Sequence, residues 1–541
     1  MSPSVPSITV GVIECSSTQF PPFIRPLPKY IASSDVHYLQ VKDALSLPEE
    51  LIRKELVQTY IDYVHVRCPV LELSSLLPLV HFSTGRGEQL SILLVQSVMY
   101  AAAAFANIEI LQKAGYATRR IARRGFYNKA KLLYNLDCEP NHLIVIQSLL
   151  LMACWYEKPD EEKDSWHWTG VAVSLAERIG LNRNPTRYKT ISDSRRRLFK
   201  RLWWSCYMYD RLIALSLRYP PRIDDEDFDV PMLSDDDFED IKALEYECGL
   251  QQSCLSQGKI QQPHIANIFI ARAKLCVAIG HVIQAQYSVV FHDETLGNTG
   301  TRNIMLAPNK SINNIHNVNT IYSELCTWAE QLPECCRYQR PQHCSFDTGK
   351  GAIIQRALLQ MEFETAVSAL FRPYVFLPLL SDVQTWSEVQ HTARRRVQSA
   401  ALQVTQLAAD LQRAGLIQYL PATAVAIILS AGIVHLTSMQ GVLHEAYSSI
   451  MRDFQQHMFL LEALREIYPE ADFASSFLST LVHNCSNEKL VTQIAKPGGF
   501  QETFTLTGVT EQESMFCISP SQLLVSRFSG MASTGPATLR P

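Results

Sequence analysis

The chain has 541 residues, of which 47% are hydrophobic and 19% charged, with a formal net charge of −4. This balance is typical of a globular protein with a large core, and it excludes a chain whose bulk charge is built to coat nucleic-acid phosphates. The 14 cysteines are scattered rather than set in the tight spacings of a secreted disulfide framework, which favours a reducing compartment.

The N-terminal segment, residues 1–29, is predicted to be irregular, because Ser and Pro are frequent and no helical period is sustained. It lacks the basic start and continuous apolar run of a signal peptide. The apolar runs at 149–156 and 422–436 are too short to span a bilayer. We therefore expect no membrane partner.

Helical periodicity begins near Pro48 and continues through most of the chain. Gly180, with Pro185 just beyond it, is predicted to end one of the helices. No alternating pattern is long enough to build a sheet, so the predicted class is all-α with disordered termini. Helices are expected at about 48–65, 88–111, 118–136, 142–157, 164–179, 194–215, 263–290, 312–332, 350–376, 384–414, 420–440, 443–467 and 472–484.

Two other segments are predicted to be irregular. Residues 292–311 hold glycines, asparagine and a proline, and we expect a loop insertion that is the site most open to proteolysis. Residues 487–541 are rich in Pro, Gly, Ser and Thr, and we expect a disordered tail. The predicted domain between the termini is 30–486.

The stretch 195–233 is the most informative part of the sequence. Apolar residues at helical spacing place one face of its first half in the core, and Phe228 and Val230 are predicted to pin an extended segment that follows Pro220 and Pro221. The helix starts with the bases Arg195, Arg196, Arg197, Lys200 and Arg201, and the acids Asp224, Asp225, Glu226, Asp227 and Asp229 follow the prolines. We predict that the acids fold back to neutralise the bases; an anionic ligand or nucleic acid is the alternative. We also predict that Trp203, Trp204 and Tyr207 are buried and that Asp210 or Arg211 is ion-paired inside the domain.

This stretch resembles the signature of the fungal-specific transcription factor domain, the middle region of zinc binuclear cluster regulators, and most of all its version in the cutinase transcription factors. Trp166, Gly170 and Gly180 upstream, and Arg372 and Pro373 downstream, match further family patterns, so the resemblance covers roughly 30–470. The residues that match the central signature are Arg197, Leu202, Trp203, Trp204, Ser205, Asp210, Arg211, Pro221, Asp225, Glu226, Asp227, Asp229, Val230 and Pro231.

The resemblance implies a helical regulatory domain that controls transcription of metabolic or biosynthetic genes in the nucleus, without catalysis. Its implied partners are the transcription machinery or a zinc-cluster protein, with a small-molecule effector and a dimer also in keeping with the family. A ligand-sensing or partner-dependent co-regulator that does not bind DNA is the alternative.

The family's DNA reader is a cluster of six cysteines that holds two zinc ions and should precede residue 30. Only Cys15 is found there. We therefore expect no cofactor in this chain and weak direct DNA binding at most. Zinc would be a cofactor only if a cysteine cluster lay upstream. Two explanations for the missing cluster are a wrongly placed first methionine and a true loss of the cluster.

Three other patterns were weighed for chemistry. Asp236, Asp237 and Asp240 spell the magnesium motif of helical terpene cyclases, but no second metal motif accompanies them, so a solvated acidic loop is expected. Cys335, Cys336, His343 and Cys344 are not expected to form a metal site, and the three cysteines are expected to be free thiols. Solvated helix faces are expected for the bases Arg119, Arg120, Arg123, Arg124, Lys129, Lys131, Arg394, Arg395 and Arg396, with nuclear-import signals or partner surfaces as alternatives.

Overall fold

The computed structural model describes residues 20–76, 79, 89–153, 163–238, 262–293, 302–309, 315–341, 349–375, 384–438 and 444–494. The all-α prediction is confirmed, since helices make up nearly all regular structure in these residues. The first half contains α1 (Ser33–Val41), α2 (Glu50–Thr59), η1 (Tyr60–His65), η2 (Leu73–Leu76), α4 (Ile92–Ala103), α5 (Ile108–Lys113), α6 (Arg119–Asn135), α7 (His142–Met152), α8 (Ser165–Arg178), η3 (Pro185–Arg187), α9 (Asp193–Leu217) and η4 (Asp235–Asp237).

The second half is built from longer helices and one hairpin. It contains α11 (Gln262–Gln286), β1 (Tyr287–Asp293), β2 (Arg302–Pro308), α12 (Ile315–Glu330), η5 (Glu334–Cys336), α13 (Lys350–Val375), α14 (Gln384–Arg413), η7 (Ile417–Tyr419), α15 (Thr423–Ser438), α16 (His444–Arg465) and α17 (Pro469–Ile494).

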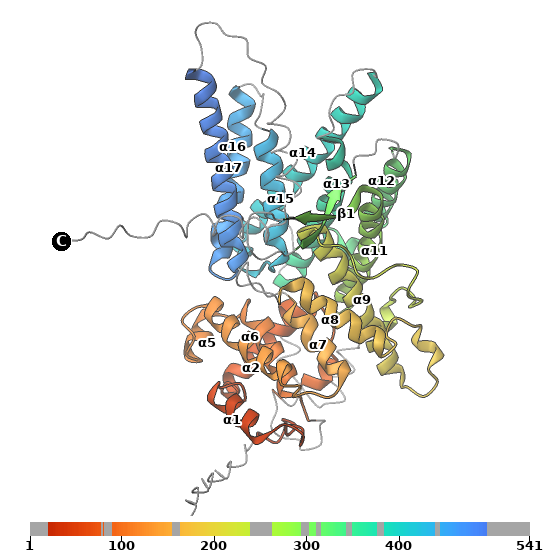
Figure 1. Ribbon diagram of the computed structural model, residues 1–541, viewed down its shortest axis with the longest axis vertical. Coiled ribbons are helices and arrows are strands. Elements are labelled where there is room, and N and C mark those ends of the chain that lie inside the picture. Colours follow the sequence, from red (N-terminus) through yellow and green to blue (C-terminus); the bar gives the residue numbers. More distant parts are fainter. Residues whose placement is uncertain are drawn as a thin grey trace, which may run out of the picture.

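The helices form two stacked groups (Figure 1). The lower group holds α1 to α8, with α4 packed on α6 and α7, and the upper group holds α12 to α17, with α13 packed on α14. Between them lie α9 and α11, which pack on each other. A single connected hydrophobic cluster runs through both groups.

Two sequence predictions about secondary structure are wrong. The expected single helix 88–111 is divided into α4, which ends at Ala103, and α5, which begins at Ile108. The expected helix 263–290 ends at Gln286, and β1 and β2 pair as an antiparallel hairpin across part of the predicted loop 292–311. The register joins Tyr287 to Pro308 and Asp293 to Arg302. Each strand has only seven residues, and apolar and polar residues do not clearly alternate along it, so the sequence pattern was too weak to predict the hairpin.

Two further points concern long helices. The stretch Ile265–Gln286 of α11 has the length and composition of a membrane span, which the sequence reading overlooked, but 67% of it is buried inside the structure. We interpret it as a core helix.

Helix α17 extends to Ile494, past the predicted boundary at 486. The predicted disorder of residues 495–541 and 1–19 lies outside the described residues, and the domain boundaries stay predictions.

Local chemistry explains the ends of the helices around α9. The side chain of Asp164 accepts from His167 N at the start of α8, and that of Ser192 accepts from Arg195 N at the start of α9. Gly180 follows α8 with φ +78°, a left-handed conformation that glycine adopts without strain, as the sequence predicted.

Candidate functional site

Helix α9 is buried on nearly all sides, rather than on the single face predicted from its period. Trp203, Trp204 and Tyr207 are at most 3% exposed, which confirms the prediction that these rings belong to the core. Leu202 and Ser205 are also buried, whereas Arg197 near the helix start is exposed. From Leu198 to Ala214 the helix therefore contacts neighbours all round, and this part cannot lie in a DNA groove while the domain is folded.

The chain after the double proline returns along α9 and is fixed by aromatic packing; we call residues 219–233 the return segment. The Phe228 ring lies 5.5 Å from Trp203, 5.9 Å from Trp204 and 5.5 Å from Tyr207, measured between ring centroids. Trp204 Nε1 donates to the carbonyl of Pro231 at 3.0 Å, and Val230 is 4% exposed. The predicted pinning by Phe228 and Val230 is confirmed.

A buried ionic cluster joins α9 to the return segment, and we call Tyr207, Asp210, Arg211 and Asp225 the α9 cluster. Arg211 donates through Nη1 to Asp210 and through Nη2 to Asp225, both at 2.8 Å. Tyr207 Oη donates to the same oxygen of Asp225 at 2.8 Å. One guanidinium is thus shared by two carboxylates, of which Asp210 is almost fully buried and Asp225 is 41% exposed.

Asp210 also fixes the turn that follows the prolines. Its carboxylate accepts from Arg222 N at 2.9 Å and from Ile223 N at 3.2 Å. Burial raises the pKa of Asp210, while Arg211 and these two amides oppose the rise. The Asp-Arg pair of the signature therefore closes the return segment onto its own helix.

Two signature glycines allow side chains to approach α8 closely. A Cβ on Gly170 would lie 2.6 Å from Cζ of Arg222, whose guanidinium stacks 3.7 Å from the Trp166 ring. Trp166 Nε1 in turn donates to the Pro220 carbonyl at 3.3 Å. Gly180 leaves room for the Tyr188 hydroxyl, 2.8 Å from where a Cβ would be. Trp166 and Gly170 thus position the start of the return segment.

The predicted neutralisation of the basic start of α9 by the acids of the return segment is wrong. Arg196 pairs with Asp193 in the first turn, and Lys200 pairs with Asp237. Arg201 donates to the Pro69 and Asp237 carbonyls. The acids instead bond elsewhere or face water: Asp229 accepts from Asn184 N at 2.7 Å and pairs with Arg187 at 2.6 Å, and Asp224, Glu226 and Asp227 are exposed.

The acidic motif after the return segment departs from the expected solvated loop at Asp237. Asp237 is 5% exposed, pairs with Lys200, and accepts from Ser234 N at 2.8 Å in a capping box. Asp236 is exposed, and Asp240 lies outside the described residues. Within the described chain, no group of three or more His, Cys, Asp or Glu is placed to hold a metal. The Asp237 carboxylate therefore stabilises the fold through its ion pair and its capping hydrogen bond.

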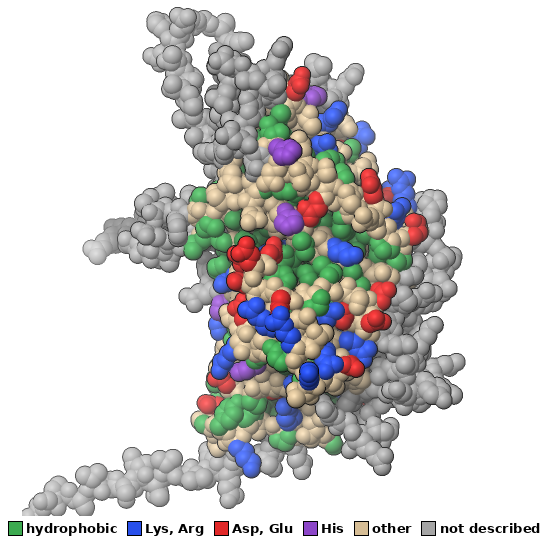
Figure 2. Space-filling model, turned by 90° about the vertical axis from the view of Figure 1, so that its right-hand side faces the viewer, with side chains coloured by type: hydrophobic (Ala, Val, Ile, Leu, Met, Phe, Trp, Pro, Cys, Tyr) green, Lys and Arg blue, Asp and Glu red, His purple; other side chains and the backbone are tan. Residues whose placement is uncertain are grey.

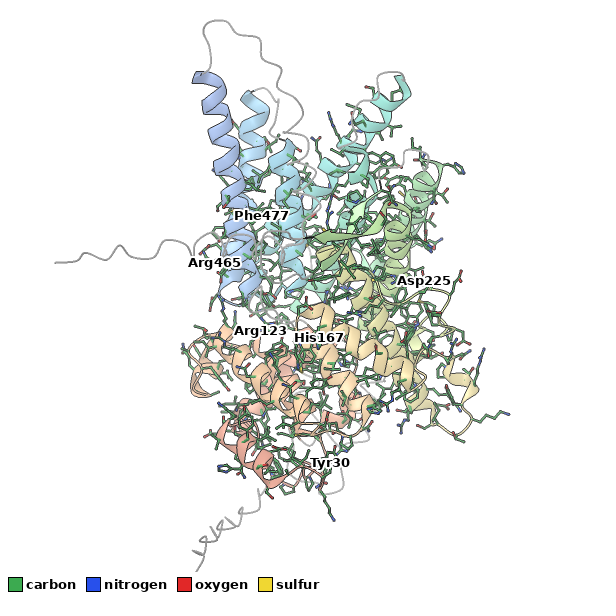
Figure 3. All side chains as sticks on the ribbon, viewed as in Figure 1. Tyr30, Arg123, His167, Asp225, Arg465 and Phe477 are labelled. Carbon is green, nitrogen blue, oxygen red and sulfur yellow. The ribbon has the colours of Figure 1, made fainter. Side chains whose placement is uncertain are left out.

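Basic residues on α6 also contradict the expectation of a solvated face. Arg123 is 2% exposed and donates to the Ile467 carbonyl at 3.1 Å and to Tyr100 Oη at 3.0 Å. Arg119 donates to the Ala106 carbonyl, and Lys129 pairs with Asp43 at 2.7 Å. Figure 3 shows Arg123 at the boundary between the two groups of helices, below Arg465. These bases hold the fold together.

The signature residues on α13 lie near the far end of α9. Arg372 is 7% exposed and donates to Ser430 Oγ on α15 at 2.9 Å, and burial lowers its pKa to about 10. Pro373 stands inside α13 and has no N–H to donate to the Ala369 carbonyl four residues earlier; that carbonyl accepts instead from Tyr287 Oη at 2.8 Å. Arg396, in the other basic run, stacks 3.7 Å from the Tyr322 ring, while Arg394 and Arg395 are exposed.

A second buried ionic group, missed at the sequence level, joins the two groups of helices; we call Arg67, Arg272, Gln355 and Glu362 the central cluster. Glu362 accepts from Arg272 Nε at 2.8 Å and from Arg67 Nη1 at 3.3 Å, and Arg272 Nη2 donates to Gln355 at 2.9 Å. Arg272 and Glu362 are each 1% exposed. Their signal was a few charges inside apolar runs, since charges are almost never fully buried without a partner. The charges are Arg272 and Lys274 within 265–283, and Arg356, Glu362 and Glu364 within 352–371.

The two clusters meet through α11. A Cβ on Gly280 would lie 3.0 Å from Arg211 Nε and 3.4 Å from the Tyr207 hydroxyl, so α9 approaches α11 closely there. Arg272 is two turns earlier on the same helix. Helix α11 therefore connects the α9 cluster to the central cluster. The arrangement is suited to holding one conformation of a large helical body, and it has no catalytic constellation among the described residues.

Comparison with known proteins was made at the level of families and of whole chains. The family model described as the fungal specific transcription factor domain matches residues 57–330. The chain is 43% identical over 476 residues to cutinase transcription factor 1 beta of Fusarium vanettenii, covering 87% of this chain and 54% of that protein. It is 31% identical over 468 residues to transcription factor cpaR of Aspergillus oryzae, covering 85% and 76% of the two chains.

A more distant match, 27% identical over 409 residues, is cutinase transcription factor 1 alpha of Fusarium vanettenii, with 75% of this chain and 40% of that protein covered. The chain thus spans about half the length of the two cutinase transcription factors, 54% of 1 beta and 40% of 1 alpha.

Proposed function

Because the chain belongs to the fungal specific transcription factor domain family, we propose that it regulates transcription in the nucleus and is not an enzyme. The observation that carries the proposal is the family match over residues 57–330, which contains the whole α9 cluster and the return segment. The names of several relatives connect them to metabolic genes, including the cutinase factors and an acetamidase regulatory protein. By this likeness we propose metabolic or biosynthetic genes as targets.

The signature residues serve this function by fixing the shape of the regulatory body. Trp203, Trp204 and Asp210 are buried; Trp204 and Asp210 are hydrogen-bonded within the chain and Trp203 packs on Phe228, so their side chains have no free face for bases or phosphates. Their role is to keep the return segment closed on α9 and to hold α9 against α11. A regulator of this kind acts through the surfaces that such a body presents to partners.

Sequence-specific DNA reading is proposed to reside in a zinc cluster outside these 541 residues. The sequence has no run of six closely spaced cysteines, and its net charge of −4 gives no broad attraction to phosphates. On the face seen in Figure 2, Lys and Arg side chains are interspersed with Asp and Glu. The proposed partners are the transcription machinery or a zinc-cluster protein, and an effector and a dimer stay predictions.

A tethering assay tests the regulatory role. The full chain is fused to an unrelated DNA-binding module, and transcription of a reporter gene carrying that module's site is measured in a fungal host. We expect the fusion to raise or lower reporter transcription relative to the module alone. Leu402→Ala, at a side chain 39% exposed on α14, should behave as the parent fusion, and Trp203→Ala should remove the effect by opening the core.

A fusion that is nuclear, folded and without effect on the reporter would overturn the regulatory role. A band-shift with the chain alone tests the second part of the proposal, for which we expect weak, salt-sensitive binding without sequence preference. Tight and sequence-selective binding of duplex DNA by this chain alone would overturn the placement of the DNA reader outside it.

A further inference from the structure

Two adjacent thiols face each other in the 3₁₀ turn η5. Cys335 Sγ and Cys336 Sγ lie 3.8 Å apart, and neither cysteine takes part in a disulfide. The tight turn Glu334–Cys336 brings these two neighbouring sulfurs together. The pair therefore presents two sulfur ligands at one point.

The two thiols differ in exposure, and this difference sets an order of reaction. Cys335 is partly exposed, whereas Cys336 is 1% exposed. Burial raises the pKa of the Cys336 thiol to about 12, with Cys335 adding to the rise, so Cys336 is a poor thiolate nucleophile by itself. A reagent would bind Cys335 first and Cys336 second.

We propose that Cys335 and Cys336 form a binding site for trivalent arsenicals. An organic arsenoxide reacts with both thiols: two As–S bonds form, the As=O oxygen leaves as water with the two thiol protons, and arsenic stays trivalent. No oxidant or reductant is needed. The second sulfur binds intramolecularly, so the bidentate site gains a large effective concentration over a single thiol.

An arsenical bound to Cys335 and Cys336 would disturb the packing of the central cluster. Turn η5 packs against α11, and the guanidiniums of Arg356 and Arg272 lie close enough to influence the Cys336 thiol. Arg272 holds Glu362 and Gln355, and Arg356 is 5% exposed. An arsenic atom with its organic group cannot enter between these side chains without displacing some of them, because buried side chains are closely packed. The inference does not depend on the proposed function.

Native mass spectrometry of the full chain, reduced with a phosphine and mixed with phenylarsine oxide, tests the site. We expect one arsenical to be retained in the presence of a monothiol and removed by a small dithiol. Cys335→Ser and Cys336→Ser should each weaken retention at this site about a hundredfold, because only one sulfur remains. Cys326→Ser, at a half-buried thiol on α12, is the matched control and should retain the arsenical.

Two results would overturn the site. One is retention that neither single serine substitution weakens. The other is reaction only after denaturation, since adjacent cysteines are accessible together in any unfolded chain. Amide hydrogen exchange tests the link to the central cluster: the arsenical should change exchange in α11 around Arg272, and bound arsenical with unchanged exchange there would refute the link.

Discussion

The α9 cluster and the central cluster have opposite arrangements of charge. In the first, Arg211 lies between two carboxylates, Asp210 and Asp225; in the second, Glu362 lies between two guanidiniums, Arg67 and Arg272. In the α9 cluster, ion-paired residues are at most 14 positions apart in the sequence. In the central cluster, Arg272 and Arg67 are 90 and 295 positions from Glu362. One can form as soon as its own hairpin forms, and the other needs both groups of helices.

This difference predicts which side chain of each cluster can be substituted with only a small loss of stability. Removing one of two like charges leaves a paired group, but removing the shared counter-ion leaves two like charges buried together. Leaving a buried charge uncompensated costs about 3–5 kcal/mol, far more than losing one redundant hydrogen bond. The shared group, rather than the charge type, should therefore decide the effect of a substitution.

The largest effect is expected for Glu362→Gln. Both buried guanidiniums of the central cluster then lose their shared carboxylate, and we expect the free energy of unfolding to fall by about 3–5 kcal/mol. Arg67→Met leaves the Arg272–Glu362 pair intact and should cost only about 1–2 kcal/mol. Urea titration of the two variants measures both values, and equal losses would contradict the shared-carboxylate account.

In the α9 cluster the order of sensitivity should reverse. Arg211→Met leaves Asp210 and Asp225 facing each other, and we expect a loss of about 2–3 kcal/mol, moderated because Asp225 is partly solvated. Asp210→Asn keeps an acceptor for the turn amides and leaves Asp225 for Arg211, so it should cost about 1 kcal/mol. A greater loss for Asp210→Asn than for Arg211→Met, in the same urea titration, would break the comparison.

A further carboxylate, Glu364, lies two residues from Glu362 and extends the comparison to the pH dependence of stability. Burial raises the pKa of Glu364 from 4.5 to about 7, partly opposed by a hydrogen bond from Gln360 at 2.9 Å. Between these pKa values the folded state binds more protons than the unfolded state, so this group lowers stability as pH rises from about 4.5 to 7. Glu364→Gln should remove this slope.

At pH 8 Glu364→Gln should be more stable than the parent chain by about 1 kcal/mol, after allowance for the partial exposure of the side chain. Unfolding free energies across the pH range measure this effect. A variant with an unchanged pH slope would show that the buried side chain does not titrate as the structure implies.

The smallest effect is expected at Gly170. In Gly170→Ala the new methyl group meets the end of the flexible Arg222 side chain, whose stacking on Trp166 is worth roughly 0.5–2 kcal/mol. Alanine in a helix recovers about 1 kcal/mol over glycine, so the two effects nearly cancel. Thermal unfolding should therefore change little, and a large loss would mean that Arg222 is held rigidly in place.

The sequence predicted what local periodicity and local pairing determine. Most helices were found within a few residues, and the burial of Trp203 and the pairing of Arg211 followed from the pattern around the double proline. The partners of Lys200 and Arg123 were not predictable in this way, because Asp237 and Ile467 become neighbours only after distant helices have packed. The β1–β2 hairpin was missed because its two short strands show no alternation.

The bond from Arg123 to the Ile467 carbonyl has a consequence for how the protein is made. Its two partners are separated by 344 residues. At about 5–20 residues per second, a ribosome needs roughly 20–70 s to add that length of chain. For this interval α6 has emerged without Ile467 and Tyr468, which cover Arg123, so the side of α6 that carries Arg123 is a surface that only the last helices complete. The nascent chain therefore presents this surface to chaperones until α16 and α17 have been synthesised.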